Sequence, residues 1–204
     1  MENLKPDKIM CVGRNYLKHA IELGNEVPRE PLYFIKPAST LCLITDEQKT
    51  LELPKTKGEV HHELELVLRI SRQGDQLSFS HFAFGLDLTL RDLQNQMKKA
   101  GQPWEKAKVF RNSSVLGPWM TMTTLAEVMV RPFELTVNGQ VRQKGQGQDM
   151  SWKPDFLLED LPNWFPVCDG DLIYTGTPEG VGPLKLGDLV RVRSEDYSYS
   201  FECS

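Results

Sequence analysis

The sequence has few of the features that mark proteins for nucleic acids, membranes or disulfide-stabilised folds. Its 24 Lys and Arg residues form no basic run and the formal net charge is −4, so nothing favours a nucleic-acid or membrane-surface role. No segment approaches the roughly 20 apolar residues of a membrane-spanning helix. The four cysteines form no C-x-x-C pair, and the charged N-terminal residues do not resemble a secretory signal. We therefore expect a cytoplasmic protein with reduced thiols.

Two common catalytic loops are also missing. No G-x-S-x-G nucleophile elbow occurs, which argues against serine-hydrolase chemistry. The glycine-rich stretch 176–182 lacks the following G-K-[ST] of a phosphate-binding loop. What remains is an ordinary globular composition, with 204 residues of which 40% are hydrophobic and 25% charged. That length suits one domain with a sizeable core, so residues 1–204 are predicted to form a single domain.

Short strands dominate the predicted secondary structure, because 13 Pro and 15 Gly residues are scattered along the chain. The predicted strands are Lys8–Val12, Pro31–Lys36, Glu63–Ile70, Phe82–Thr89, Phe133–Val137, Asp171–Thr175, Asp188–Arg193 and Tyr197–Cys203. Asn138-Gly139 predicts a type I′ hairpin. The predicted helices are Tyr16–Leu23, Leu90–Ala100 (closed by Gly101) and Asp155–Leu161 (ended by Pro162). Since helices and strands do not alternate regularly, the pattern predicts an α+β fold that is mainly β.

The segment HHELELVLRI, residues 61–70, places two carboxylates on one face of a strand. Side chains alternate in a strand, so the leucines and Ile70 share a core face while Glu63 and Glu65 share the other. Their separation of roughly 6.6 Å along the strand would allow one cation to reach both. The segment alone equally fits an edge strand whose acidic face is solvated.

The segment FAFGLDLT, residues 82–89, adds a third acid. Asp87 faces the same way as Ala83 and Gly85, which suggests a site with room beside the carboxylate. In the following helix, Arg91 and Gln94 share a face and would lie near Asp87. Three carboxylates are hard oxygen ligands that suit Mg²⁺ or Mn²⁺. His61 and His62 are interpreted as structural neighbours of the site rather than ligands.

Together these segments resemble the fumarylacetoacetate hydrolase family. The resemblance includes H-E-L-E at 62–65, G-L-D-L-T-L-R-D-L-Q at 85–94 and T-G-T-P-E-G-V-G at 175–182. V-G-R-N-Y at 12–16, F-I-K-P at 34–37 and W-E-K-A-K-V-F at 104–110 point to its compact acylpyruvase-like and oxaloacetate decarboxylase-like branch. Each motif is weak alone, but they occur jointly and in the family's order.

The resemblance implies a fold, a cofactor and roles for residues. It implies a rolled mixed sheet with few short helices, usually in a homodimer, and a Mg²⁺ or Mn²⁺ ion. The implied metal ligands are Glu63, Glu65 and Asp87; the implied catalytic residues are His19, Glu22 and Lys108; and the expected substrate-binding residues are Arg91, Gln94, Thr177 and Lys36. Without the resemblance, the His-x-x-Glu pair would be read as a surface pair on a short helix, and Lys108 as an ordinary exposed lysine.

The expected function is metal-dependent hydrolysis of a C–C bond in a small 1,3-dicarbonyl acid, an acylpyruvate, through a metal-bound enolate. His19, made more basic by Glu22, would activate the attacking water. Oxaloacetate decarboxylation and oxaloacetate keto–enol tautomerisation use the same enolate-stabilising site and stay open as alternatives. A protein that binds a metal or small acid without catalysis is a remote alternative.

Two stretches depart from the family pattern. Ser71–Ser80 is short and lacks a clear helix where relatives carry one, and Met150–Asp169 contains two tryptophans and three prolines. Neither contains a proposed ligand, so we expect them to affect the rim of the pocket or a dimer surface rather than the chemistry.

Overall fold

The computed structural model describes residues 6–17, 29–55 and 58–204. Its strands are β1 (Lys8–Gly13), β2 (Leu32–Pro37), β3 (Leu41–Leu43), β4 (Thr50–Leu51), β5 (Val60–His62), β6 (Leu64–Gln73), β7 (Gln76–Asp87), β8 (Thr89–Leu90), β9 (Ser114–Leu116), β10 (Met120–Thr121), β11 (Pro132–Val137), β12 (Gln140–Gln146), β13 (Leu172–Tyr174), β14 (Gly182–Leu184), β15 (Leu189–Ser194) and β16 (Tyr197–Cys203). Its helices are α2 (Arg91–Lys99), α3 (Glu105–Lys108), α4 (Leu125–Val130) and α5 (Pro154–Asp160), with 3₁₀ turns η1 (Ala38–Thr40), η2 (Gly147–Asp149) and η3 (Leu161–Asn163).

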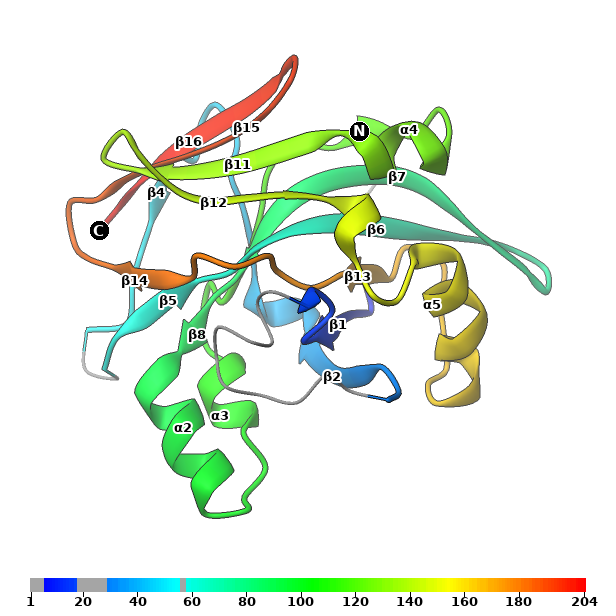
Figure 1. Ribbon diagram of the computed structural model, residues 1–204, viewed down its shortest axis with the longest axis horizontal. Coiled ribbons are helices and arrows are strands. Elements are labelled where there is room, and N and C mark those ends of the chain that lie inside the picture. The colour runs from blue at the N-terminus through cyan, green and yellow to red at the C-terminus, as the bar shows by residue number, and fades with distance from the viewer. Residues whose placement is uncertain (1–5, 18–28, 56–57) are drawn as a thin grey trace.

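The described strands form three sheets. The largest has eight strands, in the order β2-β1-β13-β6-β7-β9-β3, with β10 paired to β7. A second sheet has the order β12-β11-β15-β16-β4, and a third the order β14-β5-β8. In the eight-stranded sheet, parallel pairs such as β1 with β13 occur beside antiparallel ones, so this sheet is mixed. Figure 1 shows the second sheet lying across one side of β6 and β7, with α2 and α3 on the far side of the molecule. The predicted mainly β, rolled architecture is confirmed.

The main core lies between the two large sheets, and the alternation in β6 and β7 places it there. Leu64, Leu66 and Leu68 point into this core together with Phe84 of β7. From the other sheet, its buried side chains include Phe133, Leu135, Val190, Val192 and Phe201. Ile70 departs from the predicted stripe because the β6–β7 register shifts between Arg69 and Ile70, which moves Ile70 to the cluster beneath α5.

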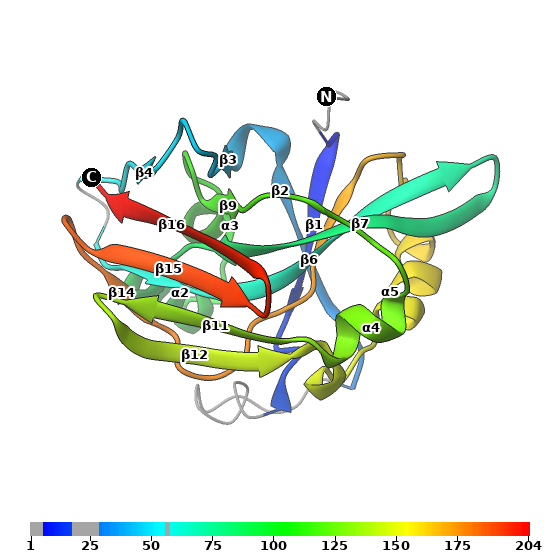
Figure 2. The same ribbon diagram turned by 90° about the horizontal axis from the view of Figure 1, so that it is seen from above.

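Smaller clusters cover the opposite face of the large sheet. Met10, Ile173 and Ile70 pack against Leu157 of α5, and the view from above shows α5 beside the end of the β6–β7 hairpin (Figure 2). A short cluster of Cys11, Val67, Ala83, Leu116 and Tyr174 fills the space near the middle of the sheet. Among the described residues, no helix has the length and apolar character needed to cross a membrane.

Local turn chemistry follows the sequence. Asn138 and Gly139 both have positive φ angles, 52° and 79°, as a type I′ hairpin between β11 and β12 requires. Gly101 closes α2 with a φ of 63°, and its N–H donates to the carbonyl of Lys98. The predicted helix Asp155–Leu161 agrees with α5 to within one residue at each end, and Pro162 lies beyond it in the 3₁₀ turn η3. Most of the predicted helix Tyr16–Leu23 lies outside the described residues.

Two strand boundaries differ from the prediction in ways that matter for the site. The predicted strand Glu63–Ile70 is interrupted at Glu63, which separates β5 from β6. The predicted strand Phe82–Thr89 is part of the longer β7, which ends at Asp87. The stretch 71–80, where the sequence lacks a clear helix, forms the tip of the β6–β7 hairpin, with its turn between Gln73 and Gln76.

Candidate active site

Three acids meet where β5, β6 and β7 come together. Glu63 lies in the break between β5 and β6, and its carbonyl accepts the backbone N–H of Asp87 (2.9 Å) at the end of β7. Glu65 of β6 is paired with Gly85 of β7. The carboxylates of Glu63, Glu65 and Asp87 are buried, and one oxygen from each lies within 4.8 Å of the other two. The structure thus brings together the three acids that the sequence predicts.

Three buried cations balance these acids. Lys36 Nζ donates to Asp87 Oδ1 and to the carbonyl of Ser113, both at 2.6 Å. Lys108 Nζ donates to Glu63 Oε2 at 2.7 Å and also to Asp87. Arg91 pairs with Glu63. The buried centre therefore contains as many basic as acidic side chains.

The negative charges of Asp87 and Glu63 act to raise the pKa of both Glu65 and Lys108. Burial raises the pKa of the Glu65 carboxyl well above its ordinary value, and the charges of Asp87 and Glu63 act in the same direction. Burial opposes the charged form of Lys108, but Asp87 and Glu63 outweigh it and raise its pKa above the ordinary value. Lys108 is therefore a fixed positive charge at neutral pH, rather than a base.

The residues fit a divalent cation. Glu65 is fully enclosed, and the backbone N–H of Gly176, at 2.7 Å, is its hydrogen-bond donor among the described residues. A buried carboxylate beside two others is costly unless positive charge compensates it. An oxygen-only donor set favours Mg²⁺ or Mn²⁺ over Zn²⁺. Glu63, Glu65 and Asp87 would hold such an ion.

A cavity of about 230 Å³ opens onto this centre. Its lining comprises Val12, Gly13, Arg14, Leu32, Phe34, Glu63, Glu65, Asp87, Arg91, Gln94, Lys98, Trp104, Lys108 and Thr177. Arg91, Gln94, Thr177 and Lys108 therefore lie at the cavity, where the sequence places them. Lys36 does not line it; this fully buried lysine lies behind Asp87 and holds that carboxylate. His19 and Glu22 lie outside the described residues.

Sequence analysis missed a buried amide that organises one wall. Gln143 of β12 accepts a hydrogen bond from the backbone N–H of Leu64 (2.9 Å), and its Oε1 lies 2.8 Å from Nδ1 of His62. Its Nε2 donates to Thr177 Oγ1 (2.7 Å) and to the carbonyl of Pro178 (2.9 Å). His62 is thus tied to this network and stands outside the acidic cluster, as its structural interpretation predicts.

The open space that the sequence predicts beside Asp87, next to Gly85, is filled by neighbouring residues. A Cβ on Gly85 would come within 2.5 Å of the carbonyl of Val115, 2.9 Å of Val67 and 3.0 Å of the Tyr174 hydroxyl. The glycine therefore permits close packing of β7 against β9 and Tyr174. The open space of the site lies on the side of Arg14, Leu32 and Trp104 instead.

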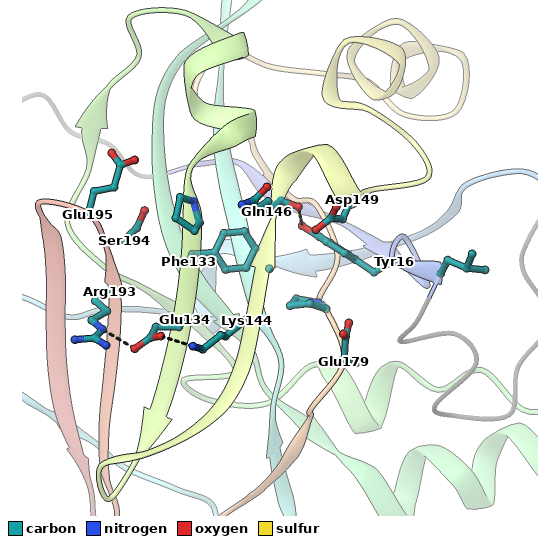
Figure 3. Close-up of a pocket in the computed structure, with 14 residues that line it drawn as sticks. Tyr16, Phe133, Glu134, Lys144, Gln146, Asp149, Glu179, Arg193, Ser194 and Glu195 are labelled. Carbon is teal, nitrogen blue, oxygen red and sulfur yellow. Dashed lines mark hydrogen bonds and ion pairs between the residues drawn. The ribbon is translucent and has the colours of Figure 1, made fainter.

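A second cavity, of about 920 Å³, is larger but has a different character. It lies against β11 and β12, with Tyr16, Phe133 and Pro178 among its lining (Figure 3). Its charged groups include Glu134, which is ion-paired with Arg193 and with Lys144 (3.4 Å). The two cavities have no lining residue in common. The acidic centre therefore opens only onto the smaller of these two.

The rolled sheets and the acidic centre agree with comparisons against known proteins. The model of the fumarylacetoacetate (FAA) hydrolase C-terminal domain matches residues 8–198. The chain belongs to the fumarylacetoacetate hydrolase family of enzymes.

Individual relatives indicate which members of this family the chain is similar to in sequence and in fold. The chain is 42% identical over 199 residues to the oxaloacetate tautomerase YcgM of Escherichia coli, with 94% of this chain and 90% of the relative covered. It is 34% identical to a mitochondrial oxaloacetate decarboxylase of Dictyostelium discoideum, over 90% of this chain and 87% of the relative. A crystal structure of fumarylpyruvate hydrolase from Pseudomonas aeruginosa, in complex with Mn²⁺ and pyruvate, superposes with a TM-score of 0.89 at 32% identity, covering 97% of this chain and 89% of that one.

Proposed function

We propose that the chain is a divalent-metal-dependent enzyme that catalyses the keto–enol tautomerisation of oxaloacetate, with residues 1–204 as a single catalytic domain. The observation that carries this proposal is the buried triad of Glu63, Glu65 and Asp87 at the base of a small cation-lined cavity. The similarity to an Escherichia coli oxaloacetate tautomerase over nearly the whole chain supports the reaction.

The size and charge of the cavity support a small anionic substrate. At about 230 Å³, the cavity is smaller than the roughly 300–1,000 Å³ of pockets for drug-sized ligands. Arg91 and Lys108 line it, and Nε of Arg91 is a buried donor without a hydrogen-bond partner among the described residues. Such a donor is expected to bind an oxygen of the substrate, since an unsatisfied buried N–H is costly.

The chain's own residues would bind the substrate and stabilise its charge. A Mg²⁺ or Mn²⁺ ion held by the triad would act as a Lewis acid that polarises a carbonyl of the substrate. When a proton leaves C3 of oxaloacetate, negative charge moves to the 2-oxo oxygen. Lys108 is fixed as a cation by Asp87 and Glu63, so it can stabilise that oxygen without changing its own protonation.

The other predicted residues complete this assignment. Gln94 and Thr177 line the cavity and would orient the substrate by hydrogen bonds. We assign to His19, oriented by Glu22, the transfer of the proton from C3 to the 2-oxo oxygen; the sequence predicts the same pair as the activator of water in the hydrolytic reaction. Lys36 would act through Asp87, because it is enclosed behind that carboxylate.

Hydrolysis of an acylpyruvate is the second candidate. The His-x-x-Glu spacing of His19 and Glu22 suits activation of a water, and a fumarylpyruvate hydrolase has the same fold at 32% identity. Decarboxylation of oxaloacetate uses the same binding face, and a relative at 34% identity is an oxaloacetate decarboxylase.

The test measures three reactions side by side in the presence of Mg²⁺ or Mn²⁺ and after chelation. Ultraviolet absorbance follows enolisation of oxaloacetate, and product analysis follows pyruvate release from oxaloacetate and from acetylpyruvate. We expect metal-dependent enolisation that is lost in Asp87→Asn and kept in Asp75→Asn, a control in the exposed hairpin turn. Pyruvate from acetylpyruvate, abolished in His19→Ala, would establish the hydrolase instead. Enolisation unaffected by chelation would overturn the metal-dependent mechanism.

We also propose a homodimer located in the cytoplasm. The family resemblance supports the dimer, and the four free cysteines support a reducing compartment. Light scattering during size-exclusion chromatography tests the first, with a monomer as the contrary result. Fractionation of the native cells tests the second.

A further inference from the structure

Two cations at the cavity form no ion pair with any of the described acids. The side chains of Arg14 and Lys98 line the cavity, and within the described part of the chain neither takes part in a hydrogen bond or an ion pair. Arg91, Lys108 and Lys36 differ in this respect, because each is bonded to Glu63 or Asp87. Arg14 and Lys98 are therefore available to a ligand, whereas the other three cations already neutralise the acids.

The backbone of Arg14 is held in an unfavourable conformation. Its φ angle is 57°, in the left-handed region that a residue with a Cβ adopts only at a cost. The next residue, Asn15, fixes this turn: its side chain donates to the carbonyls of Thr175 (2.8 Å) and Trp152 (3.0 Å) and accepts from the N–H of Trp152 (2.7 Å). A strained position that its neighbours hold in place beside a cavity points to a functional role.

Lys98 is placed by the periodicity of α2. Arg91, Gln94 and Lys98 follow the spacing i, i+3, i+7, so they lie along one stripe of the helix. Lys98 is seven residues from Arg91, roughly 10 Å along the axis, and helical side chains lean back toward the N-terminus. Its side chain is partly buried, and burial lowers its pKa to about 8, with Arg14 and Arg91 acting in the same direction. Arg14 and Lys98 thus line the same cavity.

We propose that Arg14 and Lys98 form a binding subsite for the second carboxylate of a dicarboxylic 2-oxo acid. This inference rests on the proposed function and adds to it the residues that bind the second carboxylate of oxaloacetate. The acidic triad with Lys108 and Arg91 receives the 2-oxo acid end. The far carboxylate then lies between two cations that form no ion pair within the described part of the chain. Leu32 and Phe34 form an apolar part of the remaining wall.

The experiment removes each charge and compares two substrates that differ only at the far end. Lys98→Met removes the cation and keeps an unbranched side chain only one atom shorter, and Arg14→Asn removes a charge while keeping a residue that tolerates the left-handed backbone. The exposed neighbour Lys99→Met is the matched control. The substrates are oxaloacetate and its 4-methyl ester, which enolises in the same way but lacks the far charge. KM and kcat are measured for both.

In Lys98→Met and in Arg14→Asn we expect kcat/KM for oxaloacetate to fall about tenfold or more through KM, the effect of losing one charge-assisted hydrogen bond. The ester should change less than about threefold, and Lys99→Met should match the wild type. An equal fall for both substrates would overturn the subsite while leaving the proposed function intact.

A binding measurement separates the two proposals. Calorimetry with Mg²⁺-loaded protein compares L-malate with L-lactate, two 2-hydroxy acids that differ by the second carboxylate. The subsite is supported if the wild type binds malate more tightly than lactate and either variant loses that preference. Failure of the wild type to enolise oxaloacetate would then refute only the proposed function. Equal affinities for malate and lactate in the wild type would refute the subsite.

Discussion

Replacing Glu65 with glutamine should separate two effects of its carboxylate on stability. One is the destabilisation caused by the buried charge, and the other is the stabilisation gained when the carboxylate binds a metal ion. Glu65 is fully enclosed and lies beside Asp87 and Glu63, and these surroundings raise its pKa well above the ordinary value. A carboxyl whose pKa is raised by folding destabilises the fold once it ionises, and this penalty is absent below the pKa of the unfolded chain. Glutamine removes the charge, and its amide oxygen can still accept the N–H of Gly176.

The expected effects have opposite signs with and without metal. In the metal-free protein at pH 7, Glu65→Gln should be as stable as the wild type or more stable. A bound ion that is present at about 100 times its dissociation constant stabilises the wild type by about 2.7 kcal/mol. For a chain of this size, that raises the melting temperature by about 5 to 10 °C. The variant should lose most of this increase, because it lacks one of three ligands.

Thermal unfolding with and without Mg²⁺ or Mn²⁺ measures both effects, and Glu47→Gln, at an exposed position, is the control. The control should retain the full metal-induced rise. A rise in Glu65→Gln equal to that of the wild type would show that Glu65 is not a ligand. A metal-free variant several degrees less stable than the wild type would show that the carboxylate is well compensated without an ion.

Two further perturbations test the buried polar groups around the centre. Burial lowers the pKa of His62 to about 4. As the pH falls from about 6.5 to 4, this histidine is protonated in the unfolded chain but not in the folded one, so the free energy of unfolding should fall by up to about 3 kcal/mol. In urea unfolding, His62→Asn should lose this pH dependence and His81→Asn should keep it. Lys36→Met removes a fully buried partner of Asp87 and should cost about 3–5 kcal/mol, whereas Lys49→Met at the surface should cost under 1 kcal/mol in the same denaturation assay.

The parts of the fold that the sequence predicts are those set by local pattern. Alternation in 64–68 and 82–86 places leucines and phenylalanines on one face of β6 and β7, and the core lies on that face. Asn138-Gly139 and Gly101 adopt the positive φ angles that their positions require. Boundaries were less predictable: the break at Glu63 depends on its contact with Asp87, 24 positions away in the sequence and on another strand.

The acidic triad was predictable for a related reason. Glu65 and Asp87 belong to strands whose apolar faces are evident, so the opposite faces of those strands are known as well. The two buried lysines were not predictable from pattern alone, because Lys36 reaches Asp87 from β2 and Lys108 from α3, across 51 and 21 positions. Only the resemblance to a known family pointed to them. Arg14 belongs to the V-G-R-N-Y motif, yet nothing in its neighbours indicates that its side chain lines the cavity.

The role of Gln143 could not be predicted from the sequence. It lies in a polar stretch of β12, where nothing distinguishes it from Gln140 or Gln146. In the structure, its amide oxygen is bonded to His62 and Leu64, and its nitrogen donates to Thr177 and Pro178, which uses the full capacity of a primary amide. Because Gln143 belongs to the five-stranded sheet and Thr177 lines the cavity, the packing of one sheet on the other fixes a wall of the active site. The position of Thr177 is therefore a property of the whole fold and cannot be read from its own motif.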